Sequence, residues 1–515
     1  MCSLVGFPPL PPEGHISLCE MFGKVHSAPA DQADLNFVTN VVSKHPTVTI
    51  TRELLRTSLY REELKEVFLP VQETLVKRLV HIWYEQGMVE ALKSLANPSH
   101  GDIPPLLQRV ASFMLKVARG VTQIRNTFHP HLRECGPKLI AAVAQTRDWD
   151  TCPIRCLAWH PHCTKLAVAA WDDSVRVFSS NSNLTPVLKC KNQRAISCLA
   201  WRPLSASELA VGCEEGVYVW QVDPNSVVTH PSTNCATILK RYGHSPVTSI
   251  AWSPQGHLLL TASAHDTTMY AWDVSMERYT PIKRMGGGGV CMVSWAPSGS
   301  HVFAAASGIV FRVWETRKWI PERWTVMSGR VQTACWSPCG SILMFATTEE
   351  PVIYSLSLSG AQILYQAKDT PPKVALRAVD LTPIELESGD RLGGLVHSLA
   401  WDHLGHHLAV LFKDCDVVAI FKTQLTPLLL VAPCCLVRGL KEEVPNAINF
   451  QKNFFEGAVL TIAWSSGRVQ HFPLLSSDYS PGRDLSQEIS CTNSVLTSSM
   501  QSIANTSVMS CFLSP

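Results

Sequence analysis

The sequence predicts an all-β protein, a seven-bladed WD-repeat β-propeller with an N-terminal helical segment and a flexible C-terminal tail. Three observations predict this fold. A pair of aromatic anchors recurs seven times, the distance within each pair is nearly constant, and the segments between the anchors have the two-residue period of strands. The chain has 515 residues, of which 46% are hydrophobic and 17% charged. This composition is sufficient for a large buried core.

The repeat is clearest from Gly243 to Val274, which contains the segments GHSPVTSIAWSP and TTMYAWDV. In each copy an apolar strand ends in a first anchor, a turn follows, and two further strands end in a second anchor. The first anchors are Trp159, Trp201, Trp252, Trp295, Trp336, Trp401 and Phe450, and the second anchors are Phe178, Trp220, Trp272, Trp314, Tyr354, Phe421 and Phe472.

The spacing of these anchors indicates a closed ring. Successive first anchors, such as Trp252 and Trp295, are separated by about the 40 to 45 residues that a four-stranded propeller blade needs, and loop insertions account for the longer steps. The longest insertion lies between Tyr354 and Trp401. Because each small sheet buries its faces only against its neighbours, all seven units are expected to pack into one ring from residue 151 to residue 475.

One buried polar set is predicted in the third unit. In a WD-repeat blade, a His of the Gly-His turn, a Ser or Thr of the second strand, an Asp of the next turn and the Trp of the third strand form one hydrogen-bonded group. His244, Ser263, Asp266 and Trp272 occupy these positions. His, Ser and Asp together also occur in nucleophilic catalysis. The repeat accounts for every spacing, so we interpret the set as structural.

The segments on either side of the predicted ring differ from it. Residues 52–146 are expected to be helical, because apolar residues recur at steps of three and four after Pro104 and again after Pro70. Residues 1–51 are expected to form an extended lead-in, in which 47–50 alternates like a strand and could complete the last blade. Residues 476–515 are rich in Ser and Thr without periodicity, which predicts a flexible tail. The apolar residues of the longest helical run are Leu106, Val110, Phe113, Met114, Val117, Val121 and Ile124.

Composition argues against several classes of protein. The formal net charge is +2 without a dense basic stretch, so direct binding to nucleic acid is not expected. The most apolar stretch, residues 425–437, contains two prolines and is shorter than the about 20 apolar residues that a membrane span needs. We therefore expect no direct membrane insertion. The 18 cysteines are scattered and no signal peptide precedes them, which favours reduced, intracellular thiols.

No residue group commits the chain to catalysis or to a cofactor. Walker A, GxSxG and HExxH sequences are absent. The segment from His160 to Cys163 offers soft metal ligands, but it occupies a turn where other units carry Arg-Pro or Ser-Pro. Cys434 and Cys435 are adjacent and would point apart on a strand. We therefore expect no catalytic, cofactor-binding or metal site.

Several segments resemble the aladin family, WD-repeat nucleoporins of the nuclear pore complex. They include MCSLVGFPPLPP, LAWHPH, DDSVRVF, LAWRPLSASELAV, GHSPVTSIAWSP, GRVQTACWSP and RLGGLVHSLAWD. The resemblance covers nearly the whole chain, although the tail departs from the proline-rich end expected in that family. Functions assigned to the extreme C-terminus of the family are therefore in doubt for this chain.

The resemblance implies a non-enzymatic scaffold at the nuclear envelope. Its expected partners are a multi-pass pore-membrane nucleoporin, other nuclear pore subunits, and transport cargo or receptors. The implied roles are nucleocytoplasmic transport of protein and mRNA and a function at mitotic spindle poles, with a minor cytoplasmic pool. The residues alone leave a second interpretation open, a WD-repeat substrate receptor or adaptor of an enzyme complex such as a ubiquitin ligase, docked through the helices of residues 52–125.

Overall fold

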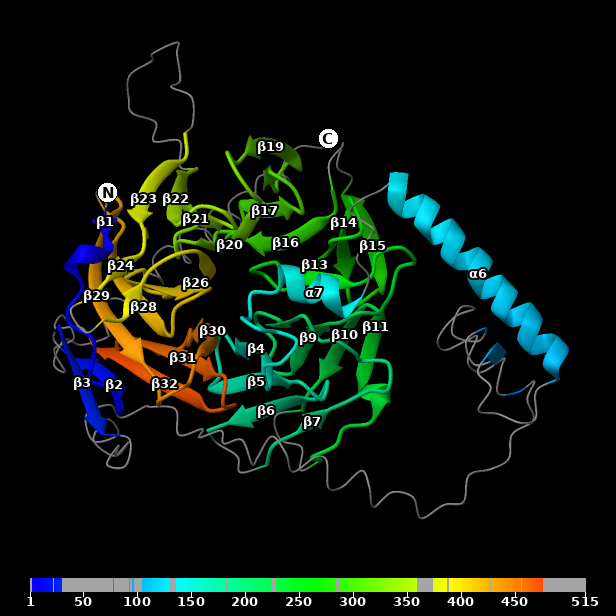
Figure 1. Cartoon of the computed structure of the whole chain (residues 1–515), viewed down its shortest axis with the longest axis horizontal. Coiled ribbons are helices and arrows are strands. Elements are labelled where there is room, and N and C mark those ends of the chain that lie inside the picture. The colour runs from blue at the N-terminus through cyan, green and yellow to red at the C-terminus, as the bar shows by residue number, and fades with distance from the viewer. Residues whose placement is uncertain are drawn as a thin grey trace, which may run out of the picture.

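The computed structural model describes residues 2–21, 23–29, 104–128 and 136–475, with gaps at 181–183, 224–227, 283–287, 359–373, 387–388, 427 and 455, and the isolated positions 77, 92, 95 and 96. Within these residues, seven small sheets surround a central axis (Figure 1). The predicted seven-bladed propeller is thereby confirmed. The tail and the stretch 47–50 lie outside the described residues, and so does the helical run after Pro70 apart from Lys77, which is helical.

Each of the first six blades is built on an antiparallel meander of four strands that runs outward from the axis. Blade 1 comprises β4 (Ile154–Trp159), β5 (Lys165–Ala170), β6 (Val175–Ser179) and β7 (Val187–Leu188), and blade 2 comprises β8 (Cys198–Trp201), β9 (Glu208–Gly212), β10 (Val217–Gln221) and β11 (Ala236–Leu239). Blade 3 comprises β12 (Val247–Trp252), β13 (Leu259–Ser263), β14 (Met269–Asp273) and β15 (Arg278–Ile282), and blade 4 comprises β16 (Val290–Trp295), β17 (His301–Ala306), β18 (Val310–Glu315) and β19 (Ile320–Thr325).

The last three blades follow the same plan with additions. Blade 5 comprises β20 (Val331–Trp336), β21 (Ile342–Thr347), β22 (Val352–Ser357) and β23 (Leu376–Asp380), and blade 6 comprises β26 (Val396–Trp401), β27 (His407–Phe412), β28 (Val417–Gln424) and β29 (Leu430–Arg438). Between them lies a ribbon of β24 (Ile384–Glu385) and β25 (Arg391–Leu392), and blade 7 contains β30 (Pro445–Phe450), β31 (Ala458–Trp464) and β32 (Val469–Leu475).

The two anchors of a repeat lie in one row across the blade. In blade 1, Trp159 ends the innermost strand and pairs with Leu166, which in turn pairs with Phe178 on the third strand. The register of blades 2, 3, 4, 6 and 7 places their anchors in the same way. Cross-strand neighbours of this kind are the unit that stabilises a sheet. The constant spacing in the sequence therefore reflects a constant register.

Blade 5 differs in its second anchor. Trp336 pairs with Leu343, and Leu343 pairs with Leu356, whereas Tyr354 lies opposite Phe345. The residue in the anchor row is therefore Leu356, and Tyr354 occupies the preceding position on the same face of β22. The assignment of Tyr354 as an anchor is therefore wrong. The pattern required an aromatic residue at this position, but the residue buried there is the aliphatic Leu356.

The N-terminal residues 2–29, here called the strap, cross three blades. Its strand β1 (Cys2–Ser3) runs parallel to β23 of blade 5. A 3₁₀ turn (Leu4–Gly6) follows, and the ring of Phe7 packs edge-on at 5.0 Å against Phe421 of blade 6. In blade 7, β2 (His15–Met21) runs parallel to β32, and β3 (Lys24–Pro29) forms the outer edge. The strand that completes the last blade is thus β2, which closes the ring from the opposite end of the chain.

In the part of the chain that the structure describes, two α-helices with assigned bounds precede the ring. The predicted helix is present as α6 (Pro105–Phe128), and in Figure 1 it lies beside the ring, with its apolar residues largely exposed apart from Ala111 and Leu115. The short helix α7 (Pro137–Val143) lies at the centre of the ring and buries Leu139 and Ile140 against the blades. No helix in the described part of the chain combines the length and apolarity needed to span a bilayer.

Candidate functional site

The polar set predicted in blade 3 is present, but one of its four members is a different residue from the one predicted. His244 Nδ1 lies 3.1 Å from Asp266 Oδ2, and His244 Nε2 lies 2.9 Å from the hydroxyl oxygen of Thr261. The indole Nε1 of Trp272 donates to the same hydroxyl at 3.0 Å. One continuous hydrogen-bonded chain therefore joins the Gly-His turn to the third strand, and its central hydroxyl belongs to Thr261.

Ser263, which the sequence places in this set, lies outside it. Its hydroxyl accepts a hydrogen bond of 3.3 Å from the backbone N–H of His265 in the following turn. Trp272 pairs with Leu259, so its indole reaches the diagonal neighbour Thr261, while Ser263 is one further step along the same face. The assignment of Ser263 is corrected to Thr261, because the cross-strand register decides which hydroxyl the indole meets.

The electrostatics of this set indicate a structural role. Burial by itself raises the pKa of Asp266, but hydrogen bonds from His244 and from the Thr268 amide outweigh it and bring the pKa below its ordinary value. Asp266 is therefore a carboxylate that is already satisfied by donors of its own blade. His244 is 3% exposed. The hydroxyl-bearing residues Thr261 and Ser263 are buried as well.

The first anchors connect neighbouring blades. The indoles of Trp295 and Trp401 donate within their own blades, whereas three others donate a hydrogen bond to a carbonyl oxygen on the innermost strand of the preceding blade. The sequence alone gives no partner for these indoles, since each partner lies a whole blade earlier in the chain. These bonds run from Trp201 Nε1 to Ala158 O at 3.0 Å, from Trp252 Nε1 to Ala200 O at 3.1 Å, and from Trp336 Nε1 to Ser294 O at 3.3 Å.

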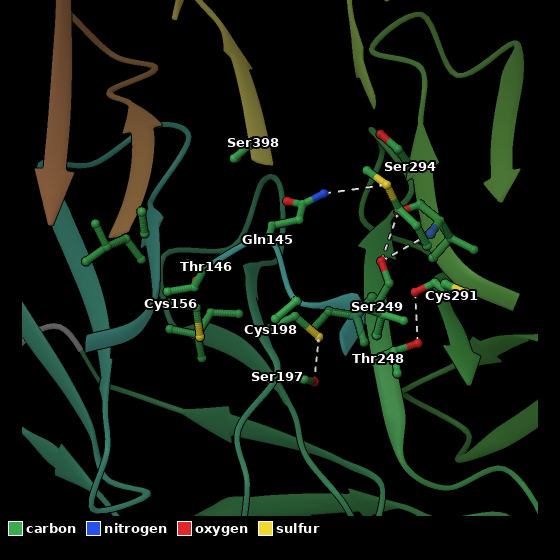
Figure 2. Close-up of a pocket in the computed structure, with 18 of the residues that line it drawn as sticks. Gln145, Thr146, Cys156, Ser197, Cys198, Thr248, Ser249, Cys291, Ser294 and Ser398 are labelled. Atoms are coloured by element: carbon green, nitrogen blue, oxygen red, sulfur yellow. Dashed lines mark hydrogen bonds between the residues drawn. The ribbon is translucent and has the colours of Figure 1, made fainter. Parts of the chain in front are cut away.

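A central cavity of about 280 Å³ lies between the end of α7 and the innermost strands of all seven blades (Figure 2). Two of its hydroxyl groups donate hydrogen bonds to the next blade. Ser197 donates to Val247 O at 2.7 Å, and Thr248 donates to Cys291 O at 2.8 Å. The described residues that line the cavity include no acid, no histidine and no cationic side chain. General acid–base chemistry has no group to carry it at this place.

Two thiols of the cavity, those of Cys156 and Cys198, are poor nucleophiles. Burial raises the pKa of Cys198 to about 12 and raises the pKa of Cys156 well above its ordinary value. A cysteine attacks as its thiolate, and burial in apolar surroundings suppresses that form. Burial therefore keeps these two thiols in their protonated form.

The histidine of the blade 1 turn is likewise fully engaged. Nδ1 of His160 accepts hydrogen bonds from the backbone N–H groups of His162 and Cys163 at 3.0 and 2.9 Å, and Nε2 lies 2.8 Å from the carbonyl oxygen of Ser205. Both ring nitrogens thus hold turns in place. His160 has no nitrogen left for a metal ion.

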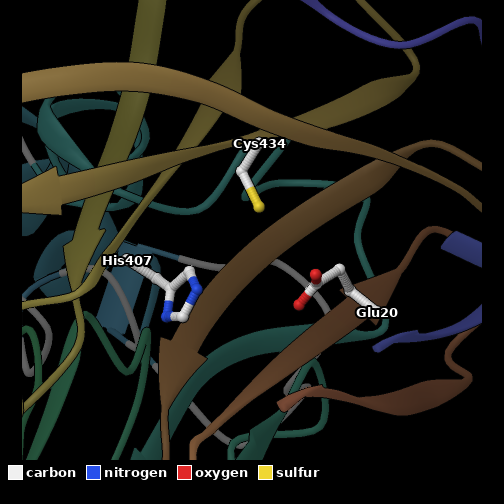
Figure 3. A group of neighbouring side chains, drawn as sticks. All are labelled: Glu20, His407 and Cys434. Atoms are coloured by element: carbon white, nitrogen blue, oxygen red, sulfur yellow. The ribbon is translucent and has the colours of Figure 1, made fainter. Parts of the chain in front are cut away.

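A different group of side chains has the donor atoms of a metal site. Glu20 of β2, His407 of β27 and Cys434 of β29 lie with their ligand atoms within 4.8 Å of one another. Figure 3 shows the three side chains converging from separate strands. Glu20 and His407 are each 5% exposed, and burial raises the pKa of the Glu20 carboxyl. Sequence reasoning missed this group because its members are dispersed in the chain and share no motif.

The two adjacent cysteines near this group do not point apart. Ile420 pairs with Cys435 and Phe421 pairs with Pro433, so Cys434 is the extra residue of a β-bulge. A bulge interrupts the alternation of side chains along a strand. The Cys434 and Cys435 thiols are consequently in hydrogen-bond contact, and this contact together with His407 lowers the pKa of Cys434. The expectation of divergent thiols is wrong for this reason.

The similarity of this chain to known proteins includes the ring and its central helix. The family model described as the Aladin seven-bladed propeller matches residues 135–475. Aladin of Arabidopsis thaliana is 28% identical over 397 residues, which is 71% of this chain and 82% of that protein. A probable cytosolic Fe-S cluster assembly factor of Schizosaccharomyces pombe is 31% identical over 142 residues, 27% of this chain and 22% of that protein. A chain in a crystal structure of the mitotic checkpoint complex is 16% identical with a TM-score of 0.46, covering 63% of this chain and 89% of that one.

Proposed function

This chain belongs to the aladin family, and from that membership we propose that it is a non-enzymatic scaffold subunit of the nuclear pore complex. The observation that carries the proposal is the extent of the family match, from residue 135 to residue 475. That range contains α7 and all the strands from β4 to β32. The shared unit is the closed ring with its central helix, which fits a protein that acts through surfaces.

The site chemistry supports a binding role over a catalytic one. The polar set of blade 3 is satisfied within the blade, and the central cavity is lined by hydroxyls that join blades and by thiols of raised pKa. A propeller offers two broad faces and a rim of loops for partners. Scaffolding requires no more than these surfaces and a stable ring.

The finer part of the proposal concerns place and partners. We infer that the protein is held at the nuclear envelope by a multi-pass pore-membrane nucleoporin, contacts other pore subunits, and supports nucleocytoplasmic transport. A role at spindle poles in mitosis and a minor cytoplasmic pool belong to the same proposal. The family resemblance supports them, and the closed ring of the described residues offers broad faces for a membrane-embedded partner.

The test is proximity labelling in intact cells with the full chain as bait. Enrichment of pore-membrane proteins and a signal at the nuclear rim are expected. A variant lacking residues 440–475, which form most of blade 7, should disperse because the ring cannot close. A variant lacking residues 476–515 is the matched control and should remain at the rim. Enrichment of ubiquitin-ligase subunits without pore proteins would overturn the proposal and favour a substrate receptor.

A further inference from the structure

We propose that Glu20, His407 and Cys434 bind a zinc ion that fastens the strap to blade 6. Glu20 lies on β2, which belongs to the strap, whereas His407 and Cys434 lie on β27 and β29 of blade 6. Glu20 comes from the other end of the chain, and yet the three ligand atoms meet within 4.8 Å. This proposal does not depend on the assignment of the protein to the nuclear pore.

The spacing of the donor atoms suits a tetrahedral zinc ion. Zinc binds Cys sulfur at about 2.3 Å and His nitrogen or carboxylate oxygen at about 2.0 to 2.2 Å, so ligand atoms of a tetrahedral site are roughly 3.3 to 3.8 Å apart. The upper bound of 4.8 Å on the separations of the three ligand atoms is about 1 Å above this range. Three protein ligands leave a fourth position for solvent. A thiol, an imidazole and a carboxylate together form a donor set typical of zinc rather than of calcium or magnesium.

The histidine of this group differs from the structural histidines of the blades. His244 and His160 use both ring nitrogens in hydrogen bonds within the fold. In the described part of the chain, Nδ1 of His407 is buried without a hydrogen-bond partner. The other side of the ring faces the Cys434 sulfur and the Glu20 carboxylate (Figure 3). The nitrogen on that side is in hydrogen-bond contact with the Cys434 thiol, so Nε2 is the nitrogen that would bind the ion.

The charges of the group also favour a cation. Glu20 is nearly buried, and one of its carboxylate oxygens accepts a hydrogen bond of 2.6 Å from the Gly23 amide, which fixes the side chain. The β-bulge at Cys434 brings a second potential anion, the thiolate, to the same place. Buried anions are stable in proteins when they are paired or coordinate a metal. Lys422, which lies opposite His407 on β28, is a cation whose charge acts on both groups, and a divalent ion would add to that compensation.

Zinc at this position would couple metal binding to ring closure. The strap otherwise contacts blade 6 through hydrogen bonds such as that from the Arg438 amide to the Ser17 hydroxyl, 3.1 Å long. Coordination adds bonds between β2 and both β27 and β29. Because the three ligands meet only in the folded ring, binding free energy contributes directly to the stability of the closed state.

The first experiment uses the full chain with cobalt(II) as a spectroscopic probe. The folded, chelator-treated protein should take up one cobalt ion with the near-ultraviolet absorption of a cobalt–thiolate bond, and zinc should displace it. Cys434→Ser should remove this absorption and weaken zinc binding by at least about tenfold. Cys339→Ser, which changes an exposed cysteine outside the group, should retain both. No thiolate absorption in the folded wild type, or the same absorption in Cys434→Ser, would overturn the proposal.

The second experiment needs no substitution and locates the effect. Amide hydrogen exchange of the wild-type chain is measured after chelation and with free zinc at ten times its dissociation constant. Peptides that cover residues 15–29 should exchange about tenfold more slowly with zinc, because opening of the strap then requires loss of the metal. Peptides of β5 and β6 in blade 1 should not respond. Equal exchange of residues 15–29 in both conditions would contradict a zinc-fastened strap.

Discussion

The indole nitrogen of Trp159 donates a hydrogen bond of 2.8 Å to the hydroxyl of Thr461, and this contact joins the first blade to the last. The same hydroxyl lies 3.0 Å from Nδ1 of His471 on β32. Blade 7 therefore repeats the Trp–Thr–His arrangement of blade 3, but with the indole supplied by its neighbour. Asn449 adds a second bond across the same seam, from Nδ2 to the carbonyl oxygen of Leu157 at 3.0 Å.

The first prediction concerns this seam. Thr461→Val keeps the volume of the side chain but removes the hydroxyl that the Trp159 indole and the His471 imidazole share. A buried polar group left unsatisfied costs about 1 to 3 kcal/mol, and we expect the free energy of unfolding to fall by that amount. Denaturant unfolding of the purified chain measures it. Thr151→Val, at an exposed turn, is the control, and equal stability of the two variants would argue against the seam.

The second prediction tests the corrected polar set of blade 3. Thr261→Val should lower the free energy of unfolding by about 1 to 3 kcal/mol, because it removes the hydroxyl that His244 and Trp272 share. Ser263→Ala should cost less, since it removes one backbone contact of 3.3 Å. Asp266→Ala should resemble Thr261→Val. A larger effect of Ser263→Ala than of Thr261→Val would restore the original assignment.

The sequence predicts the parts of this fold that repeat. Anchors such as Trp159 and Trp201 are visible because register forces them to a constant distance from the third strand. The position of Thr261 is less visible, because Thr261 and Ser263 share one face of a strand and only the partner register separates them. Local patterns decide which face a residue occupies, but they do not reveal which cross-strand neighbour it meets.

Long-range pairings are the part that sequence patterns do not reveal. The strap strand β2 pairs with β32, the last strand of the ring, and nothing in its own residues marks that partner. The group of Glu20, His407 and Cys434 depends on this pairing and on the bulge of β29, neither of which has a sequence signature. A donor set assembled from three strands therefore requires the structure.

The third prediction is a loss of stability in mild acid through His397 on β26. Burial, more than any neighbouring charge, lowers the pKa of His397 from 6.5 to about 4, and Arg147 and Lys413 act in the same direction. The unfolded chain therefore takes up a proton between these values and the folded chain does not. The contribution of neutral His397 to the free energy of unfolding is therefore present above pH 6.5 and is lost as the pH falls toward 4. At pH 5 the loss is on the order of 2 kcal/mol.

His397→Gln, which cannot gain a proton, should flatten the dependence of unfolding free energy on pH between 7 and 5. The measurement is denaturant unfolding at several pH values for both proteins. His230→Gln, at an exposed position, should keep the wild-type slope. Part of the slope should persist in His397→Gln, because burial also lowers the pKa of His160. Parallel curves for wild type and His397→Gln would contradict the assignment.

The last prediction compares two neighbouring residues of the strap. Leu4 is 2% exposed and packs in the core between blades 5 and 6, whereas the adjacent Val5 is 78% exposed. Truncating a buried leucine removes its apolar contacts and leaves a cavity, which costs about 2 to 5 kcal/mol. Leu4→Ala should therefore lower the unfolding temperature by several degrees, and Val5→Ala should leave it unchanged.

Removal of the whole strap should have a larger effect than Leu4→Ala, because it also exposes the outer edges of β23 and β32, and unpaired edges promote association. The chain without residues 2–29 is expected to aggregate on heating, while the chain without residues 476–515 should unfold at the wild-type temperature. Differential scanning calorimetry and light scattering on all four variants separate these outcomes. If Leu4→Ala and Val5→Ala unfold together at the wild-type temperature, the strap contributes nothing to the ring, and its pairing with blades 5 and 7 is too weak to close it.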